Sequence, residues 1–304
     1  MAQNRSAKKS YPDLHGIVLL NKPKGISSNL ALQKVRHLFK AKKAGHTGNL
    51  DPMATGLLPC CFGDATKVAH LLINSDKTYM ARCVLGIQTD TGDATGEIIN
   101  TSNKTQVTDE QIKKACGELT GEIEQIPPMY SALHHNGQRL YDLARQGKTV
   151  DRPPRPVTIH DFRMIENHKN FIDFEIKVSK GTYIRTLLED LAAKLGTVAH
   201  MSALHRTQTG IFSGDDMLTL EQLQASEALQ NHITPMETAL IEYPEMILND
   251  HQTQDLIHGK TIACEGSAKR YRLYDAQAKF LGMGDLDKSG TLKVKKLFLK
   301  SYQG

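Results

Sequence analysis

Residues 45–59, GHTGNLDPMATGLLP, form the stretch from which we predict the fold and the site. Its three glycines permit backbone angles and close approaches that other residues resist. Because Asp51 precedes Pro52, it is pushed out of the helical region, and Pro52 fixes its own φ and offers no N–H. The only carboxylate of the stretch therefore lies on backbone that cannot easily relax. A Gly/Pro-rich segment with one Asp is also typical of an ordinary turn, so local sequence leaves a turn and a catalytic loop both open.

The known phosphate-binding loops do not explain this stretch. The sequence contains neither a GxGxxG fingerprint nor a GxxxxGK[ST] loop, so phosphate binding by either mechanism is unsupported. His46 and Asp51 alone do not make a metal site. We therefore expect no bound metal here.

Residues 45–59 closely resemble the catalytic motif of the TruB family of tRNA pseudouridine synthases, whose bacterial members isomerise uridine 55 in the TΨC loop. Asn49 stands where a smaller residue is expected, at a position that looks tolerant. The resemblance extends over almost the whole chain. It implies an α+β pseudouridine synthase fold, in which helices flank a mixed, largely antiparallel central sheet, followed by a small C-terminal β-rich PUA-like domain.

Length and composition favour a two-domain protein of the reducing cytosol. The 304 residues are 39% hydrophobic, enough for a substantial core. No apolar run approaches the roughly 18 residues that span a bilayer, and the polar, basic N-terminus has no apolar segment of a secretory signal. The five cysteines include two neighbours and no CxxC pair, which argues against a disulfide framework or a zinc site. These features predict a cytoplasmic protein that is not attached to a membrane.

The charge is unevenly distributed along the chain. Residues 1–43 carry ten Lys or Arg against one acid, and residues 251–304 carry ten against five, while the segment between them is acidic. Surface charge of this kind often serves solubility. Two separated basic regions also suit a polyanion such as RNA, and the charge pattern by itself leaves both explanations open.

The N-terminal part predicts a strand and a helix ahead of the loop. Residues 1–12 are polar and basic, which is typical of disorder. A short buried strand is expected over 16–20, and Ser27 or Ser28 caps the helix that follows. The intervening NKPKGISS resembles the family's KP motif, to which we assign a bracing role, with Lys22 and Lys24 able to reach phosphate. A further helix is expected over 65–72.

Residues 77–85 are predicted to form a strand with Tyr79 on its apolar face, together with Ala81, Cys83 and Leu85. By itself Tyr79 reads as a packed aromatic residue. The resemblance implies instead that it stacks on the target base. The following QTDTGDATGE segment, residues 88–97, resembles a family loop, and we interpret its acids as turn formers rather than metal ligands.

The segment 125–155 combines aromatic and basic residues, which suits contact with folded RNA. It follows a helix that the capping-box spacing of Thr108 and Gln111 places just before it. The bland alternative is a solvated helical hairpin. The segment resembles the family insertion that closes over the T-loop, with Arg145 and Arg155 as candidate RNA contacts. His134 stands where a Lys is expected, which removes charge at neutral pH.

Residues 172–178 alternate as a half-buried strand, and a helix begins near Ile184. Arg185 then lies in the first helical turn, where the helix dipole disfavours a cation, so a nearby carboxylate is needed. The resemblance implies that Arg185 pairs with the catalytic Asp51 and that Tyr183 contacts the base. It also places Leu204 in the base pocket, with His205 in place of an expected Arg.

The texture changes near residue 247, where short apolar runs are separated by Gly and Asp turns. We expect a disordered segment at 1–12, a catalytic domain at 13–246 and a PUA-like domain at 247–304. The resemblance implies that this last domain contacts the acceptor-stem side of tRNA.

The resemblance also implies a mechanism without redox cofactor, ATP or metal. The target base must leave the folded RNA, and His46 would fill the place it vacates. Asp51 would attack C1′ as a nucleophile or remove the C2′ proton to give a glycal; the sequence leaves both open. We predict a standalone monomer that acts on tRNA without an obligatory protein partner. A non-catalytic tRNA-binding or RNA-folding protein and a guide-RNA-dependent relative are the alternatives.

Overall fold

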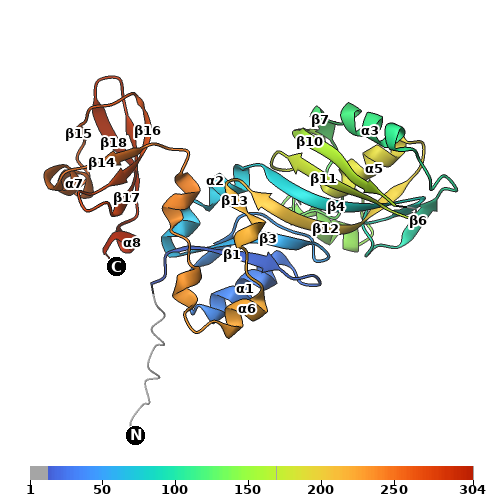
Figure 1. Cartoon of the computed structure of the whole chain (residues 1–304), viewed down its shortest axis with the longest axis horizontal. Helices are drawn as coiled ribbons and strands as arrows, with labels where there is room; N and C mark the ends of the chain where they lie inside the picture. The colour runs from blue at the N-terminus through green and yellow to red at the C-terminus, as the bar shows by residue number, and fades with distance from the viewer. Residues whose placement is uncertain (1–12, 169, 304) are drawn as a thin grey trace, which may run out of the picture.

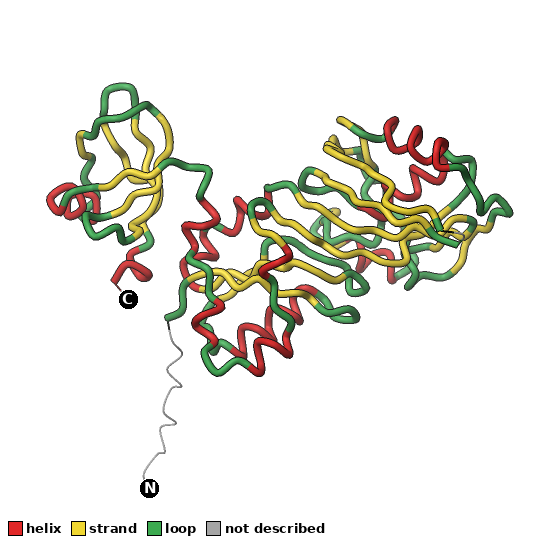
Figure 2. Tube along the Cα trace, in the orientation of Figure 1, coloured by secondary structure: helices red, strands yellow, loops and turns green. Residues whose placement is uncertain are grey.

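The computed structural model describes residues 13–168 and 170–303, so the prediction for residues 1–12 falls outside the described part. Figure 1 shows a large sheet layered with helices and, beside it, a smaller β-rich unit that holds the C-terminus. The tube in Figure 2 shows that strands run through the middle of the larger unit and that most of its helices lie on the outside. These observations confirm the predicted α+β class.

The larger sheet has nine strands, of which seven follow the order β1-β3-β12-β4-β11-β10-β7, while β2 pairs with β3 and β13 with β12. Only β3 and β12 run parallel; the other pairs in this sheet are antiparallel. The expected mixed, largely antiparallel sheet is confirmed. The strands are β1 Gly16–Lys22, β2 Ala44–His46, β3 Thr55–Phe62, β4 Lys77–Leu85, β7 Gly121–Gln125, β10 Arg155–Asn167, β11 Ile172–Val178, β12 Ala199–Thr209 and β13 Phe212–Ser213.

Two small hairpins stand apart from this sheet. Strand β5 (Ile87–Thr89) pairs with β6 (Ile98–Thr101), and β8 (His134–His135) pairs with β9 (Gln138–Arg139). The second hairpin leads into α4 (Leu140–Arg145), so the segment 125–155 is a short hairpin followed by a helix, not a helical hairpin.

Helices cover both faces of the larger sheet, and their caps follow the sequence. The Ser27 side chain accepts a hydrogen bond from Leu30 N at the start of α1 (Ser28–Leu38), and Thr108 and Gln111 form the predicted capping box of α3 (Asp109–Glu118). The other elements of the larger unit are η1 Gly63–Lys67, α2 Ala69–Asn74, α5 Ile184–Lys194, η2 Gly214–Asp216, α6 Leu220–Ala225, η3 Leu229–His232 and η4 Met236–Leu240.

The helix expected over residues 65–72 is two elements. A 3₁₀ turn, η1, comes first, and α2 begins only at Ala69. A 3₁₀ turn places residues i and i+3 directly above one another, and here it brings the Lys67 ammonium to 2.5 Å from the Asp64 carboxylate. The expected single helix is therefore wrong over residues 65–68, where the structure has the tighter turn.

The main core lies between the sheet and helices α3 and α5. On β4, alternate residues from Lys77 to Leu85 are buried, so the predicted apolar face is confirmed. The buried side of β11 and the apolar stripe of α5 join the same cluster. A second cluster packs α1 and α6 against one face of β1 and β3. The other face of these two strands meets the C-terminal unit through Phe280 and Phe298.

The C-terminal unit is a five-stranded sheet in the order β14-β16-β17-β18-β15, which confirms the predicted β-rich texture. It begins at Glu245, because β14 pairs in parallel with β16; the domain boundary at residue 247 stays a prediction. Its elements are β14 Glu245–Ile247, α7 Asp250–Ile257, β15 Ile262–Ala263, β16 Lys269–Tyr274, β17 Phe280–Leu286, β18 Thr291–Leu297 and α8 Leu299–Gln303. Across the described residues, no helix has both the length and the apolar character that a membrane crossing requires.

Candidate active site

Asp51 lies on the loop between β2 and β3, and hydrogen bonds from residues 22 or more positions away in the sequence hold that loop in place. The Ser28 hydroxyl accepts a hydrogen bond from Leu50 N at 2.8 Å and donates one to Leu50 O at 3.1 Å. Gly25 N donates to Pro52 O at 2.7 Å. The residues before and after Asp51 are therefore fixed to the NKPKGISS segment, and the predicted bracing role of that segment has a physical basis.

A second brace comes from Arg206 on β12, a side chain that sequence reasoning did not assign. Its Nε donates to Leu57 O at 2.7 Å, and its two terminal nitrogens lie 3.5 Å from Asn49 O and 3.4 Å from Gly48 O. Arg206 is only 1% exposed. One buried guanidinium thus contacts both arms of the loop.

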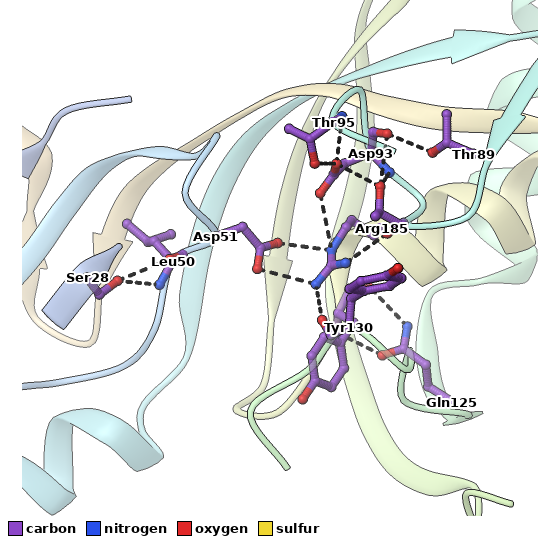
Figure 3. A network of polar contacts seen from close by, with 11 residues as sticks. Ser28, Leu50, Asp51, Thr89, Asp93, Thr95, Gln125, Tyr130 and Arg185 are labelled. Carbon is purple, nitrogen blue, oxygen red and sulfur yellow. Dashed lines mark hydrogen bonds and ion pairs between the residues drawn. The ribbon is translucent and has the colours of Figure 1, made fainter. Parts of the chain in front are cut away.

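Figure 3 shows the carboxylate of Asp51 facing the guanidinium of Arg185. Arg185 Nε lies 3.0 Å from one carboxylate oxygen, and Arg185 NH2 donates to the other at 3.3 Å. A two-point contact of this kind fixes orientation as well as charge. Arg185 stands in the first turn of α5, as predicted, and the expected ion pair with Asp51 is present.

Arg185 is held by further partners from two loops. Its terminal nitrogens donate to Thr91 O and Tyr130 O, both at 2.8 Å. Asp93 lies 4.0 Å from Arg185 Nε and accepts bonds from Thr91 and Thr95. Asp93 therefore forms the turn we predicted for residues 88–97 and also places a second negative charge beside Arg185, a role that the sequence pattern did not indicate.

The surroundings of Asp51 act on its pKa in opposite directions. Burial raises the pKa of the Asp51 carboxyl above its ordinary value, and the negative charge of Asp93 adds to this effect. The positive charges of Arg185 and Lys22 oppose it, but burial outweighs them. Of these neighbours, the sequence predicted only Arg185 as a partner of Asp51. About a third of the Asp51 side chain (34%) remains exposed, so the carboxylate is both constrained and open to a substrate.

An apolar floor lies next to Asp51. Tyr79 on β4 and Leu204 on β12 belong to the same buried cluster as the loop residues Leu50 and Met53. Tyr79 is 8% exposed and Leu204 is 7% exposed. Both predicted pocket residues therefore lie in the apolar cluster that also includes part of the Asp51 loop.

Tyr183 is the N-cap residue of α5, two residues before Arg185, and is half-buried. The Gln125 side chain pairs with its backbone: Nε2 donates to Tyr183 O at 3.1 Å, and Oε1 accepts from Tyr183 N at 2.8 Å. Burial raises the pKa of the Tyr183 phenol, so it stays protonated at neutral pH. Its charge neighbours include Asp51 and Arg155, which places Tyr183 at the same site.

His46 and His205 flank the loop from its two ends. His46 is half-buried, and its Nδ1 accepts a hydrogen bond from Gly48 N at 3.4 Å. Burial, followed by the charge of Arg206, lowers the pKa of His46, so the ring is uncharged at neutral pH. His205 Nδ1 lies 2.8 Å from the Thr55 hydroxyl. This residue, noted only as a replacement, therefore contacts the loop.

Lys22 is not placed to reach a phosphate. The residue has no exposed surface, and its ammonium donates to Pro23 O, Ile26 O and Pro52 O at 3.0, 2.7 and 3.4 Å. Burial lowers the pKa of Lys22 to about 8. The expected phosphate contact is replaced by a brace on the residue that follows Asp51. The sequence misled because a lysine in a Gly/Pro turn usually points to solvent.

The two candidate RNA contacts of the 125–155 segment are both exposed, and neither has a recorded contact with Asp51. Arg145 is exposed on α4, where an open hollow of about 650 Å³ is lined by residues including Arg139, Tyr141 and Arg145. The guanidinium of Arg145 lies 5.5 Å from the centre of the Tyr141 ring. Arg155 is exposed at the start of β10, paired with Gln125. Arg155 does not line the hollow, and its charge acts on Tyr183.

The arrangement offers acid–base or nucleophilic chemistry at one carboxylate. Within residues 13–168 and 170–303, no three His, Cys, Asp or Glu side chains gather as metal ligands would. Asp51 is oriented by Arg185, partly exposed and bordered by an apolar floor. These are the features that an ionised catalytic carboxylate requires.

Three family models match consecutive parts of the chain. The TruB family pseudouridylate synthase N-terminal domain matches residues 36–184, the tRNA pseudouridylate synthase B C-terminal domain matches 185–241, and the pseudouridine synthase II TruB C-terminal model matches 244–298. Together they cover the larger unit from α1 onward and most of the C-terminal sheet.

Curated relatives match over nearly the full length. A tRNA pseudouridine synthase B of Hydrogenovibrio crunogenus is 44% identical over 96% of this chain and 96% of its own length. Those of Nitrosococcus oceani and Aromatoleum aromaticum are 44% and 45% identical, over 94% and 93% of this chain and 95% and 92% of their own lengths.

Two solved structures share the fold. A Cbf5-Nop10-Gar1 complex contains a chain with a TM-score of 0.70 and 24% identity, covering 93% of this chain and 85% of that one. A structure of an H/ACA RNP bound to a substrate RNA containing 2′-deoxyuridine gives a TM-score of 0.70 at 22% identity, covering 98% of this chain and 93% of that one. At this identity the likeness concerns the fold.

Proposed function

Since the chain belongs to the TruB family of pseudouridine synthases, we propose that it isomerises uridine 55 in the TΨC loop of tRNA, with Asp51 as the catalytic carboxylate. The broader activity follows from the family: the chain is an RNA-binding isomerase that converts uridine to pseudouridine in tRNA. The position in the RNA and the role of each residue are the proposal.

The observation that carries the proposal is the two-point contact between Asp51 and Arg185. The reaction breaks the C1′–N1 bond, turns the uracil and joins C5 to C1′, while the C5 hydrogen leaves as a proton. An ionised carboxylate aimed at the ribose can begin this sequence. Arg185 opposes the effect of burial on the pKa of Asp51 and fixes the direction of its oxygens.

Two first steps are compatible with this geometry. Asp51 attacks C1′ and expels uracil, which gives a covalent ribosyl ester. Alternatively, Asp51 removes the C2′ proton as uracil leaves, which gives a glycal. In both routes the detached uracil stays in the pocket and recombines through C5, so no external electron or group is needed and we propose that the enzyme uses no cofactor.

The pocket residues take roles that fit their burial. Tyr79 stacks on the uracil and Leu204 supports it from the apolar floor. Tyr183 contacts the base from the start of α5. The uncharged ring of His46 fills the place that the extruded base leaves, since a neutral aromatic ring stacks well between bases. Extrusion itself costs a few kcal/mol of lost stacking and pairing.

The remaining surfaces would hold the tRNA. Arg145 and Arg155 of the 125–155 segment contact the T-loop, and the basic C-terminal sheet contacts the acceptor-stem side. Direct recognition of this kind requires neither a guide RNA nor a protein partner, and we propose a monomer that works where its tRNA substrate is, in the cytoplasm. The guide-dependent alternative is disfavoured by the 125–155 segment, whose exposed arginines provide RNA contacts within this chain.

The proposal is tested with unmodified tRNA labelled with tritium at uridine C5 and purified protein, without cofactor or guide. We expect release of one equivalent of tritium per tRNA, and no release from a tRNA in which uridine 55 is replaced. Tight tRNA binding without release would contradict the proposal and favour a non-catalytic RNA-binding protein. Release that persists after replacement of uridine 55 would retain the activity and refute the site.

A further inference from the structure

The loop that carries Asp51 leaves the sheet at β2 and returns at β3, so its shape depends on what joins its two arms. The outgoing arm contains Gly48 and Asn49, and the returning arm contains Leu57. Arg206 bonds carbonyl oxygens on both arms. A cross-link of this kind fixes how far the tip of the loop, with Asp51, projects from the sheet.

The backbone of Arg206 contacts the same region. Arg206 pairs with Gly56 across the parallel β3–β12 contact and with Tyr79 across the antiparallel β12–β4 contact. A Cβ at Gly56 would collide with the backbone of Arg206, and Gly56 has a φ of +100° that favours glycine. Arg206 therefore joins the returning arm of the loop to the strand of Tyr79.

The environment of the guanidinium suits a structural clamp with a specific shape. Among the described residues Arg206 forms no ion pair, and backbone carbonyls accept all its recorded side-chain bonds. Its positive charge also lowers the pKa of two other buried cations, Lys22 and Lys77, beyond the larger effect of their burial. A buried positive charge without a carboxylate is costly, so its retention here calls for a function that a smaller neutral side chain would not provide.

We propose that Arg206 is a positioning residue for the isomerisation: it ties the arms of the Asp51 loop so that the carboxylate meets Arg185 and the ribose at the reactive distance. This inference rests on the proposed function of Asp51. Arg206 touches neither substrate nor reacting atoms; it acts through the backbone of the loop.

The planar fork of Arg206 is essential to this role. A guanidinium offers five donors in fixed directions, whereas an ammonium is a single point. A lysine at position 206 keeps the charge, but its one nitrogen cannot replace both Nε, which bonds Leu57 O, and the terminal nitrogen that bonds Gly48 O. Arg206→Lys should therefore loosen one arm and let Asp51 move, and a misplacement of about 1 Å can cost about 100-fold in rate.

The experiment compares Arg206→Lys and Arg206→Gln with the unchanged protein in single-turnover tritium release. We expect the rate at saturating enzyme to fall about 10- to 100-fold for both variants, while the apparent affinity for tRNA changes less than about threefold. Lys77→Gln is the matched control, because Lys77 is also a buried cation whose recorded side-chain bonds all go to backbone carbonyls, those of Leu72, Ile73 and Ser75. The saturating rate of this control should stay unchanged, although the control should lose about as much thermal stability as the Arg206 variants.

A spectroscopic readout separates positioning from general damage. The charge of Arg206 contributes to the lowered pKa of His46, so the NMR titration of His46 should move to higher pH in Arg206→Gln and stay low in Arg206→Lys. Both variants nevertheless lose rate, since both lose the fork. Loss of rate in Arg206→Gln alone would mean that charge, not shape, matters and would overturn the proposal.

The remaining outcomes are also decisive. Saturating rates equal to that of the unchanged protein would overturn the role of Arg206 and leave the proposed function intact. If both variants fail to fold where the Lys77→Gln control folds, Arg206 is a folding residue and the positioning role is wrong. If the unchanged protein itself releases no tritium, the proposed function fails first, and the two failures are thereby distinguished.

Discussion

The Asp51 loop and the 125–155 segment border the same site but are built differently. The loop is bonded from below by Ser28, Lys22 and Arg206, and its neighbours in space are mostly buried. The 125–155 segment contains a hairpin whose two strands have two residues each and a six-residue helix, both lining an open hollow, with exposed arginines.

The difference assigns them separate tasks. A catalytic carboxylate must be held in place before the substrate arrives, whereas a surface that closes on folded RNA gains from side chains free to adjust. Substitutions in the loop should therefore change the rate of the chemical step, and substitutions in the 125–155 segment should change affinity. Measuring the saturating rate and the tRNA affinity separately in variants of each region tests that division.

The largest effect is expected at the tip of the loop. Asp51→Asn keeps the shape of the side chain but removes the charge that either proposed route needs. We expect the saturating rate to fall by about 1,000-fold or more, while tRNA binding changes little. Tritium release and filter binding on one preparation measure both. Substantial pseudouridine from purified Asp51→Asn would refute the essential role of the carboxylate.

Arg185→Met should have the next largest effect, because the loop then keeps Asp51 but loses its partner. Removing one member of a buried pair costs about 3–5 kcal/mol, and the partial exposure of Asp51 places the loss of stability near the lower end. The saturating rate should fall about 100-fold. Thermal melting and single-turnover rates measure these two effects.

The same variant has a pH signature with a definite sign. The positive charge of Arg185 lowers the pKa of Asp51 against the effect of burial. Without it the pKa of Asp51 rises further, so the carboxylate is lost at a higher pH during acidification. The acid limb of the pH–rate profile should therefore move to higher pH in Arg185→Met and less in Arg185→Lys. An acid limb that stays in place would show that another group governs it.

Sequence reasoning found the residues of the site where the motif or a strand period marked them. The strand of Tyr79 and the first-turn position of Arg185 follow from local patterns, and the dipole argument for Arg185 correctly demanded a carboxylate. The division of the helix predicted over 65–72 into a 3₁₀ turn and a short α-helix was not predicted, because the hydrophobic pattern does not distinguish two short helical elements from one.

The side-chain contacts that hold the Asp51 loop could not be predicted from the sequence for a different reason. Arg206 contacts Asn49 across 157 residues and Ser28 contacts Leu50 across 22, and no local period encodes such pairs. Asp93 looked like a turn former, which it is, and its proximity to Arg185 depends on the packing of the 88–97 loop against α5. Long-range polar contacts to backbone carbonyls leave no trace in composition or hydrophobic pattern.

A moderate effect on affinity is expected in the 125–155 segment. Arg145→Ala should weaken tRNA binding about tenfold and reduce the slope of log affinity against log salt by about one, as expected for a lost phosphate contact. The saturating rate should stay unchanged. Arg163→Ala is the matched control, because Arg163 is an exposed arginine of β10 paired with Glu175. A fall in saturating rate without loss of affinity would break the division between the two regions.

Lys22→Met should leave RNA binding unaltered, although Lys22 is a basic residue beside the site. Its ammonium is buried against backbone carbonyls, so the salt slope of tRNA binding should equal that of the unchanged protein, in contrast to Arg145→Ala. A slope reduced by one would restore the phosphate contact that the sequence suggested.

The stability of Lys22→Met should instead depend on pH in one direction. Burial lowers the pKa of Lys22 from 10.5 to about 8 in the folded protein. Between these values the unfolded chain binds more protons, so the free energy of unfolding that Lys22 contributes rises with pH across that window. The free energy of unfolding of the unchanged protein minus that of Lys22→Met, measured by urea unfolding, should therefore increase from about pH 8 to about pH 10.5. A constant difference would mean that the ammonium is solvated. The contact between Lys22 and Pro52 O would then no longer explain the rigidity of the Asp51 loop.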